Sequence, residues 1–410
     1  MGKIDLSKFT EALKGFESLR SYSVLLWPAV IVLASAGVMT AALMMGNSFS
    51  QKMNKESLPL ANDVKKMLDS SPAISQAEVE ARYEQQYQAD ANKIARLAEQ
   101  STERELLSYD IFPAPKESSS QLFTQFGDRF CKKVDGLTAK VSGRDCPSDE
   151  ELKRGDSGTS SVISRMPMMP ATGGDDFRII DEICQARAKS ASVYVNPADI
   201  SGYDFWEQYK YSNADTGVKD CWYWQLGYWI IEDVFSTVGT LNAGSNSVYT
   251  SPVKRVIKVG FTIPGNLFGS DGKTTSQDAP KYVIKPEDQL SESCTARLSN
   301  ENIDVVHFSI VAVVRLKDVM TYMKELCGVK EHQFMGYDGK SPVSVFRHNQ
   351  ISILESQIRP IDFASREHQN YRYGPDPVVE VDLVCEYVFN KNGYVTIKPD
   401  LTKLDAEPKN

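Results

Sequence analysis

The sequence lacks the short motifs that identify the common catalytic classes. It has no GxSxG nucleophile turn, no glycine-rich dinucleotide turn and no Cys/His catalytic signature. None of its four histidines, at 307, 332, 348 and 368, stands in HExxH, HxH or another metal-ligand spacing. We expect His332 and His348 in one loop as solvated side chains; an approach of the two rings to each other is the alternative. The sequence therefore predicts no catalytic residue, no metal and no cofactor, and indicates a protein that is not an enzyme.

Clusters of Lys and Arg are also missing. The chain has 46 Lys and Arg against 54 Asp and Glu, a formal net charge of −8 and a pI near 5.3. Phosphate backbones require clustered positive side chains, so this balance excludes nucleic acid as the expected partner. Gly272-Lys273-Thr274 is a fragment of a phosphate-binding loop, but Leu267 stands where that loop needs its first glycine.

Cysteine is sparse, and its distribution is uneven. All seven cysteines follow residue 130, their number is odd, and no CxxC occurs. This pattern fits an oxidising compartment, yet it leaves structural thiols and disulfides equally open.

One long hydrophobic run is present, at residues 24–46, and it contains no charge. At about 1.5 Å of rise per residue it spans a hydrocarbon layer of about 30 Å as a helix. We interpret it as an uncleaved transmembrane anchor after a short cytoplasmic tail, 1–23. A cleaved signal peptide is the alternative, because Ala34-Ser35-Ala36 resembles a cleavage site, but the apolar run continues well past it.

A prepilin leader, with processing at Gly15-Phe16, fits less well because the expected acid is displaced to Glu17. The basic residues flanking the run are balanced, Lys14 and Arg20 before it against Lys52 and Lys55 after it, so they give little indication of orientation. Gly37 and Ala41 form a small-residue face that favours close pairing of two such helices.

Residues 47–112 read as a helical stalk. The first helical part, with Leu60, Val64, Met67 and Leu68 on one side, is expected to break near Pro59 and again at Ser70-Ser71-Pro72. A second helix follows a capping box at Ser75 and Glu78. Its narrow stripe favours a coiled coil, although Asp90 within it leaves a helical hairpin or docking against the body open. The stripe consists of Val79, Tyr83, Tyr87, Ile94 and Leu97.

Residues 120–293 read as an aromatic-rich α+β domain with long loops. Helices are expected at 121–141 and 175–190, a strand at 254–263, and loops at 147–176 and 264–293. Trp222, Leu226 and Trp229 share one side of a further helix. Aromatic residues at helical spacing favour a core, while a carbohydrate or ligand platform is the alternative. Glu232 and Asp233 are the one carboxylate pair that we expect near such a pocket.

Residues 300–395 form the most regular block. Strands are predicted at 303–314, 351–361 and 378–389, with a helix at 316–327 between the first two and a flexible tail at 396–410. Strand, helix, strand, strand is half of a ferredoxin-like unit. The fold class is thus α+β, with a transmembrane helix, a stalk and a ferredoxin-like module.

The order of these elements resembles the bitopic assembly proteins of type IV pilus and type II secretion systems, of the PilO and GspM kind. The segments that carry the resemblance are IDVVHFSIVAVV, LKDVMTYMKELC, ISILESQIRPI and VVEVDLVCEYVF. The chain departs from that family in its aromatic-rich insertion and its greater length. The resemblance implies a non-enzymatic scaffold that dimerises in the bacterial inner membrane, with its bulk in the periplasm and other envelope proteins as partners.

The sequence is therefore consistent with three functions. The first is this assembly scaffold, a homo- or heterodimer with contacts at Gly37, Ala41, Tyr83, Tyr87, Ile94 and Leu97, and with Trp222 and Trp229 as further candidates. The second is a ligand- or carbohydrate-binding ectodomain that uses the Trp222 and Trp229 region. The third is a membrane-anchored hydrolase that uses Glu232 or Asp233.

Overall fold

The computed structural model describes residues 23–69, 74–117, 119–153, 174–263, 278–292 and 294–400. It divides into two compact units, Met1–Ala89 and Asp90–Asn410. Several predictions fall outside the described residues. They are the tail before residue 23, the break at Ser70-Ser71-Pro72, residues 154–173 and 264–277 of the two loops including Gly272-Lys273-Thr274, and the end of the chain after residue 400.

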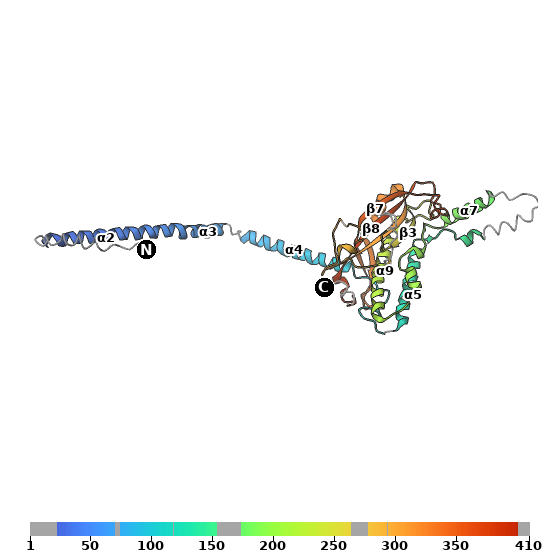
Figure 1. Ribbon diagram of the computed structural model, residues 1–410, viewed down its shortest axis with the longest axis horizontal. Coiled ribbons are helices and arrows are strands. Elements are labelled where there is room, and N and C mark those ends of the chain that lie inside the picture. The colour runs from blue at the N-terminus through green and yellow to red at the C-terminus, as the bar shows by residue number, and fades with distance from the viewer. Residues whose placement is uncertain are drawn as a thin grey trace, which may run out of the picture. The chain divides into compact units, whose positions relative to one another are not determined.

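The first unit is helical (Figure 1). Its elements are α2 (Ser23–Lys52), the π-helical turn η2 (Met53–Ser57) and α3 (Leu58–Asp69), and α4 (Ile74–Gln100) begins in it. The predicted break near Pro59 does not occur, since helical structure continues from Val30 to Asp69. Pro59 is the second residue of α3 and follows the wider π turn. There its missing N–H and its ring disturb the backbone least.

The second unit is built on a six-stranded mixed sheet in the order β1-β2-β3-β4-β8-β7. β1, β2 and β3 run parallel, and the remaining neighbours are antiparallel. The strands are β1 (Gly143–Arg144), β2 (Val193–Tyr194), β3 (Val253–Gly260), β4 (Ile303–Arg315), β7 (Ile351–Pro360) and β8 (Val378–Asn390). We expected separate domains at 120–293 and 300–395, but β3 comes from the first and pairs with β4 from the second. The two ranges therefore share one sheet and one core.

The C-terminal strands lie close to their predicted positions. β4 and β7 run parallel on either side of β8, and η5 (Leu316–Asp318) and α10 (Val319–Leu326) lie in the crossover between them. This split βαβ arrangement is part of the ferredoxin-like pattern. The crossover also contains a hairpin of β5 (Lys330–Phe334) and β6 (Ser344–His348), where we had expected a loop holding His332 and His348.

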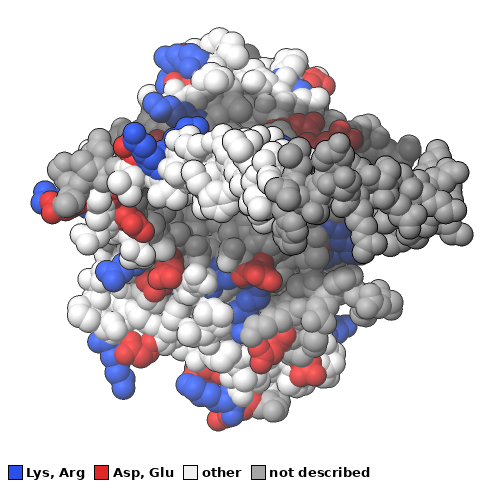
Figure 2. All heavy atoms as spheres, turned by 90° about the vertical axis from the view of Figure 1, so that its left-hand side faces the viewer, with Lys and Arg blue, Asp and Glu red and all other residues white. Residues whose placement is uncertain are grey.

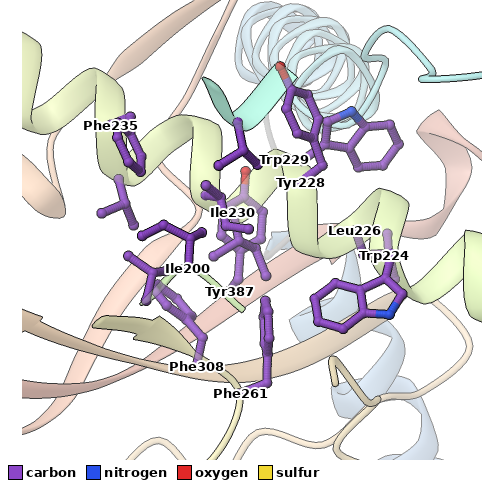
Figure 3. Packing of buried hydrophobic residues seen from close by; sticks show 14 of the residues in the cluster. Ile200, Trp224, Leu226, Tyr228, Trp229, Ile230, Phe235, Phe261, Phe308 and Tyr387 are labelled. Carbon is purple, nitrogen blue, oxygen red and sulfur yellow. The ribbon is translucent and has the colours of Figure 1, made fainter. Parts of the chain in front are cut away.

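The aromatic helix is α9 (Ala214–Leu241), and it begins where Asn213 accepts the Thr216 N–H at 2.8 Å. It packs against the sheet, and α5 packs against it in turn (Figure 1). Figure 3 shows Ile230 of α9 pointing toward Tyr387 of β8. The other helical elements of this unit are α5 (Ser120–Lys140), α7 (Gly174–Ser190), η3 (Pro197–Asp199), α8 (Tyr203–Glu207), η4 (Pro286–Asp288) and η6 (Lys391–Gly393).

The described start of the predicted C-terminal tail is docked. Ile397 is 5% exposed, and the ammonium of Lys398 donates to Asp304 at 2.6 Å. Residues up to 400 therefore belong to the folded body, because a buried ion pair anchors them. All seven cysteines are described and each has a free thiol, so the choice left open by the sequence falls to thiols.

Candidate functional site

The apolar part of α2 is suited to a bilayer. One helix among the described residues is long and apolar enough to span a membrane, and none of its apolar stretch is buried within the protein. The hydroxyls of Ser35 and Thr40 donate to the helix carbonyls of Val32 and Ala36, at 2.9 and 3.0 Å. The hydroxyls of Ser35 and Thr40 are thus satisfied without water, as hydrocarbon requires. A Cβ added at Gly37 would meet no atom within 4 Å, so the face that carries Gly37 is open.

The predicted stripe of α4 is solvent-exposed in the single chain. Tyr83, Tyr87, Ile94 and Leu97 are 57, 72, 66 and 52% exposed. They lie on a helix that is otherwise rich in Glu, Gln, Lys and Arg. Large apolar side chains in a row at helical spacing are unfavourable in water, at about 25 cal/mol per Å² of apolar surface. This row is therefore an exposed apolar surface outside α2 in the described residues; Leu60, Val64 and Leu68 of α3 form another.

Trp222 and Trp229 do not form an interaction surface. Trp222 is fully buried and Trp229 is 1% exposed. The indole of Trp222 donates to the Tyr282 hydroxyl at 2.7 Å, and that of Trp229 donates to the Glu105 carbonyl at 2.9 Å. Both side chains belong to the core, and both indole N–H groups are satisfied inside it. A carbohydrate or ligand platform on these rings has no accessible face.

Asp233 lies in a buried charge cluster rather than in a cleft. Its carboxylate accepts two hydrogen bonds from Arg104, at 2.9 and 3.1 Å, one from Tyr387 at 2.7 Å and one from His348 at 2.8 Å. Arg104 also donates to Glu232 at 2.9 Å. Burial by itself raises the pKa of Asp233, but Arg104 and His348 outweigh it and bring that pKa well below its usual range. Asp233 is therefore a fixed anion that lacks the cleft a hydrolase acid would need.

Hydrogen bonds connect His332 and His348 to this cluster. Nε2 of His332 lies 2.9 Å from the Glu103 carbonyl, which only accepts, so this nitrogen carries a proton. Burial lowers the pKa of His332 to about 4, so the ring is neutral. Nδ1 of His348 lies 3.0 Å from Nδ1 of His332, and Nε2 of His348 lies 2.8 Å from a carboxylate oxygen of Asp233. His348 therefore links His332 to the group of Arg104, Glu232 and Asp233.

A serine and a lysine at the spacing of a Ser/Lys dyad occur at Ser251 and Lys254, and both are fully buried. Lys254 donates to the carbonyls of Val248 and Tyr249, at 2.7 and 2.8 Å. Ser251 donates to the Ser247 carbonyl at 3.0 Å. Burial lowers the pKa of Lys254 to about 8. The two side chains stabilise a turn and do not form a nucleophile and base pair with each other.

A charged cavity of about 1400 Å³ involves the face of the sheet that is turned away from α9. Cross-strand pairs set its floor. Asp382 lies opposite Gln357 on one side and Val311 on the other, and Glu380 lies opposite Arg359. The Arg359 guanidinium bridges the two acids, at 2.7 Å from Asp382 and in a short contact with Glu380. The strand pleat explains this floor, because residues at 380 and 382 point away from the apolar side of β8.

The two acids of the floor, Glu380 and Asp382, have pKa values shifted in opposite directions. His368 lies 3.4 Å from Glu380 and lowers its pKa, together with Arg359. Burial instead raises the pKa of Asp382 to about 6, although Arg359 opposes the effect. Among the described residues, Oδ1 of Asp382, Oε1 of Gln357 and Nε of Arg359 are buried polar atoms without a hydrogen-bond partner. Such atoms are uncommon in folded proteins and mark a place where another group is needed.

The sequence analysis missed this cavity and the role of Arg104. The alternation in 378–389 was the available signal for the floor, because it places Glu380 and Asp382 opposite the core residues of the same strand. No local signal singled out Arg104, since its partners lie more than 120 residues away in the chain. On the face shown in Figure 2, basic and acidic side chains are interspersed, and neither sign forms a continuous patch. In comparisons with protein-family models, curated proteins and solved structures, this chain matches none.

Proposed function

We propose that this chain is a non-enzymatic, membrane-anchored scaffold of a bacterial envelope machine of the pilus or secretion type. It acts by dimerisation and by contacts with other envelope proteins. The observation that carries the proposal is the exposed stripe of α4. A surface of this kind, on a helix that follows a membrane-spanning helix in the chain, is buried most simply against the same stripe of a second copy.

The anchor contributes to the same arrangement. Two copies held in one bilayer have a high effective concentration, so a short coiled-coil contact that is weak in solution becomes sufficient. The open face at Gly37 and Ala41 provides a second contact, because small residues let two membrane helices approach closely. The proposal places the anchor in the inner membrane and the second unit in the periplasm, as the resemblance to PilO and GspM proteins implies.

Photocrosslinking in membranes tests the stripe. A benzophenone side chain at Tyr87 is expected to give a covalent dimer on illumination, because Tyr87 then lies in the interface. The same probe at Gln85, about 200° around the helix, is the control and is expected to give much less. Bands are read on a denaturing gel and identified by mass spectrometry, so a heterodimer with an envelope protein is recognised by its mass.

Substitution tests the energetics of the same contact. Ile94→Glu places a charge in the stripe and is expected to reduce the crosslinked dimer about tenfold or more, whereas Gln85→Glu is expected to leave it unchanged. A chain that remains monomeric in membranes and yields no crosslink from either probe position contradicts the proposal.

A further inference from the structure

The charged cavity is lined by the outer face of the sheet at β7 and β8, by η3 and α8, and by the first turns of α9, and it includes no residue of α2 or α4. Seven carboxylates and four basic side chains line it. Three of the four bases already have partners. Arg359 pairs with Glu380 and Asp382, and Lys258 pairs with Asp278 at 3.1 Å. Arg255 donates to the Glu367 carbonyl at 2.6 Å and lies over the ring of Tyr371. The cavity therefore offers little free positive charge to an anion.

Several of its carboxylates remain unpaired. Within the described residues, no ion pair joins Asp199, Asp204 or Asp220 to a basic side chain. Burial raises the pKa of Asp220 to about 6 and also raises that of Asp199. Lys219 opposes this rise at Asp220, and Arg255 and Lys258 oppose it at Asp199, but burial outweighs them. A carboxylate that is partly removed from water is held in an unfavourable state. A positive ligand in the cavity relieves this state at Asp220.

The floor of the cavity adds a requirement for hydrogen-bond donors. Asp382 is fully buried, lines the cavity and has an unpartnered Oδ1. Its cross-strand neighbour Gln357 has an unpartnered Oε1. Of the two residues, Asp382 lines the cavity, and its Oδ1 is an acceptor, so the group that satisfies it from the cavity must carry an N–H or O–H donor. An ammonium group has three such donors as well as the required charge.

The shape of the site distinguishes a chain-like cation from a metal ion. Among the described residues, no three His, Cys, Asp or Glu side chains are grouped closely enough to hold a metal. The carboxylates are instead distributed over η3, α8, α9 and β8 around a cavity of about 1400 Å³. The rings of Phe205 and Tyr209, 5.7 Å apart, also line it. Aromatic faces accept methylene groups and attract a neighbouring ammonium.

We propose that this cavity binds an aliphatic oligoamine, a methylene chain with two or more ammonium groups. One ammonium binds at Asp382 on the floor, and another binds at Asp220 on the wall, with the methylenes against Phe205 and Tyr209. The proposal goes beyond the scaffold function and does not depend on dimerisation, since every residue it uses lies in the second unit.

Isothermal titration calorimetry of the full chain in detergent, with spermidine as the probe, tests the site. We expect one saturable binding event per chain. Asp220→Asn and Asp382→Asn are each expected to weaken binding about tenfold or more, because each removes one charged contact. Asp128→Asn, which makes the same charge change at an exposed position on α5 outside the cavity, is expected to have no effect.

Circular dichroism confirms that each variant is folded, and Asp220→Asn alone tests the site if Asp382→Asn does not fold. Equal binding by Asp220→Asn, Asp382→Asn and the unmodified chain would overturn the proposal, as would no binding of spermidine. Displacement of spermidine by an equal concentration of Mg²⁺ would also overturn it, because an inorganic cation would then satisfy the site. Binding of a lysine-rich peptide but not of spermidine would assign the cavity to a protein partner instead.

Discussion

Asp233 connects four parts of the second unit through single side chains. Arg104 reaches it from the segment after α4, His348 from the β5–β6 hairpin and Tyr387 from β8, while Asp233 itself belongs to α9. Arg104 is buried, and its other carboxylate partner is the partly exposed Glu232. Removing the Asp233 charge therefore leaves a buried cation largely without compensation, which is the costly way to disrupt a buried ion pair.

Asp233→Asn is expected to lower the free energy of unfolding by about 3–5 kcal/mol. Urea unfolding of the full chain in detergent measures this effect through tryptophan fluorescence, because Trp222, Trp224 and Trp229 are buried and change environment on unfolding. Glu232→Gln is the matched control. Its side chain is 38% exposed, so a loss below about 1 kcal/mol is expected. Similar losses for the two variants contradict the central role of Asp233.

At the scale of elements, two glycines of α5 report on how this helix packs. A Cβ at Gly127 would lie 2.6 Å from the indole of Trp206 on α8, whereas a Cβ at Gly136 would meet nothing within 4 Å. The same glycine-to-alanine change is thus made at a tight contact and at an open position of one helix.

Gly127→Ala is expected to destabilise the protein by about 1–3 kcal/mol, because the Trp206 ring or the helix must shift. Gly136→Ala is expected to stabilise it by about 0.5–1 kcal/mol, because alanine loses less backbone entropy in a helix. Thermal unfolding of the two variants side by side measures both effects. Loss of stability in both variants would show that α5 packs more closely along its length than the structure indicates.

At the scale of the whole molecule, buried titrating groups give opposing pH dependences. Burial lowers the pKa of His307 and His332 to about 4, below the unfolded value of about 6.5. Their stability contribution is complete above pH 6.5 and is lost as the pH falls toward 4. Asp220 and Asp382 have pKa values raised to about 6, above the unfolded value near 3.9, so stability is lost as the pH rises through that window.

His307→Asn separates the two effects, because the Asn oxygen can replace Nδ1 as the acceptor of the Leu290 N–H. Between pH 7 and pH 5 this variant is expected to lose less stability than the unmodified chain, by roughly 1–2 kcal/mol. Asp382→Asn is expected to lose more, since the opposing slope is removed. Unfolding at the two pH values measures both differences, and parallel curves for all three proteins contradict the assignment.

The sequence by itself determined the elements whose pattern is local. The uncharged run predicted α2, and the wide apolar faces predicted α5 and α9. A β-rich apolar segment predicted β4, and alternation predicted β8, each within one or two residues of its ends. These predictions hold because burial of one face leaves a periodic trace in the chain. The local sequence does not specify whether Trp222 belongs to a core or to a binding platform. The packing of α9 against the sheet buries it in the core.

Only the tertiary structure decided what lies together. β3 joins β4 although a long loop separates them, so two expected domains became one. His332 and His348 lie next to each other on a hairpin rather than in a solvated loop, and the Glu103 carbonyl and the Asp233 carboxylate contact them from elsewhere in the chain. Arg104 and the acids around the charged cavity are likewise brought to their neighbours from distant parts of the chain. Charges interact through space at a few ångströms and leave no period in the sequence, so the sequence could name Asp233 but not its partners.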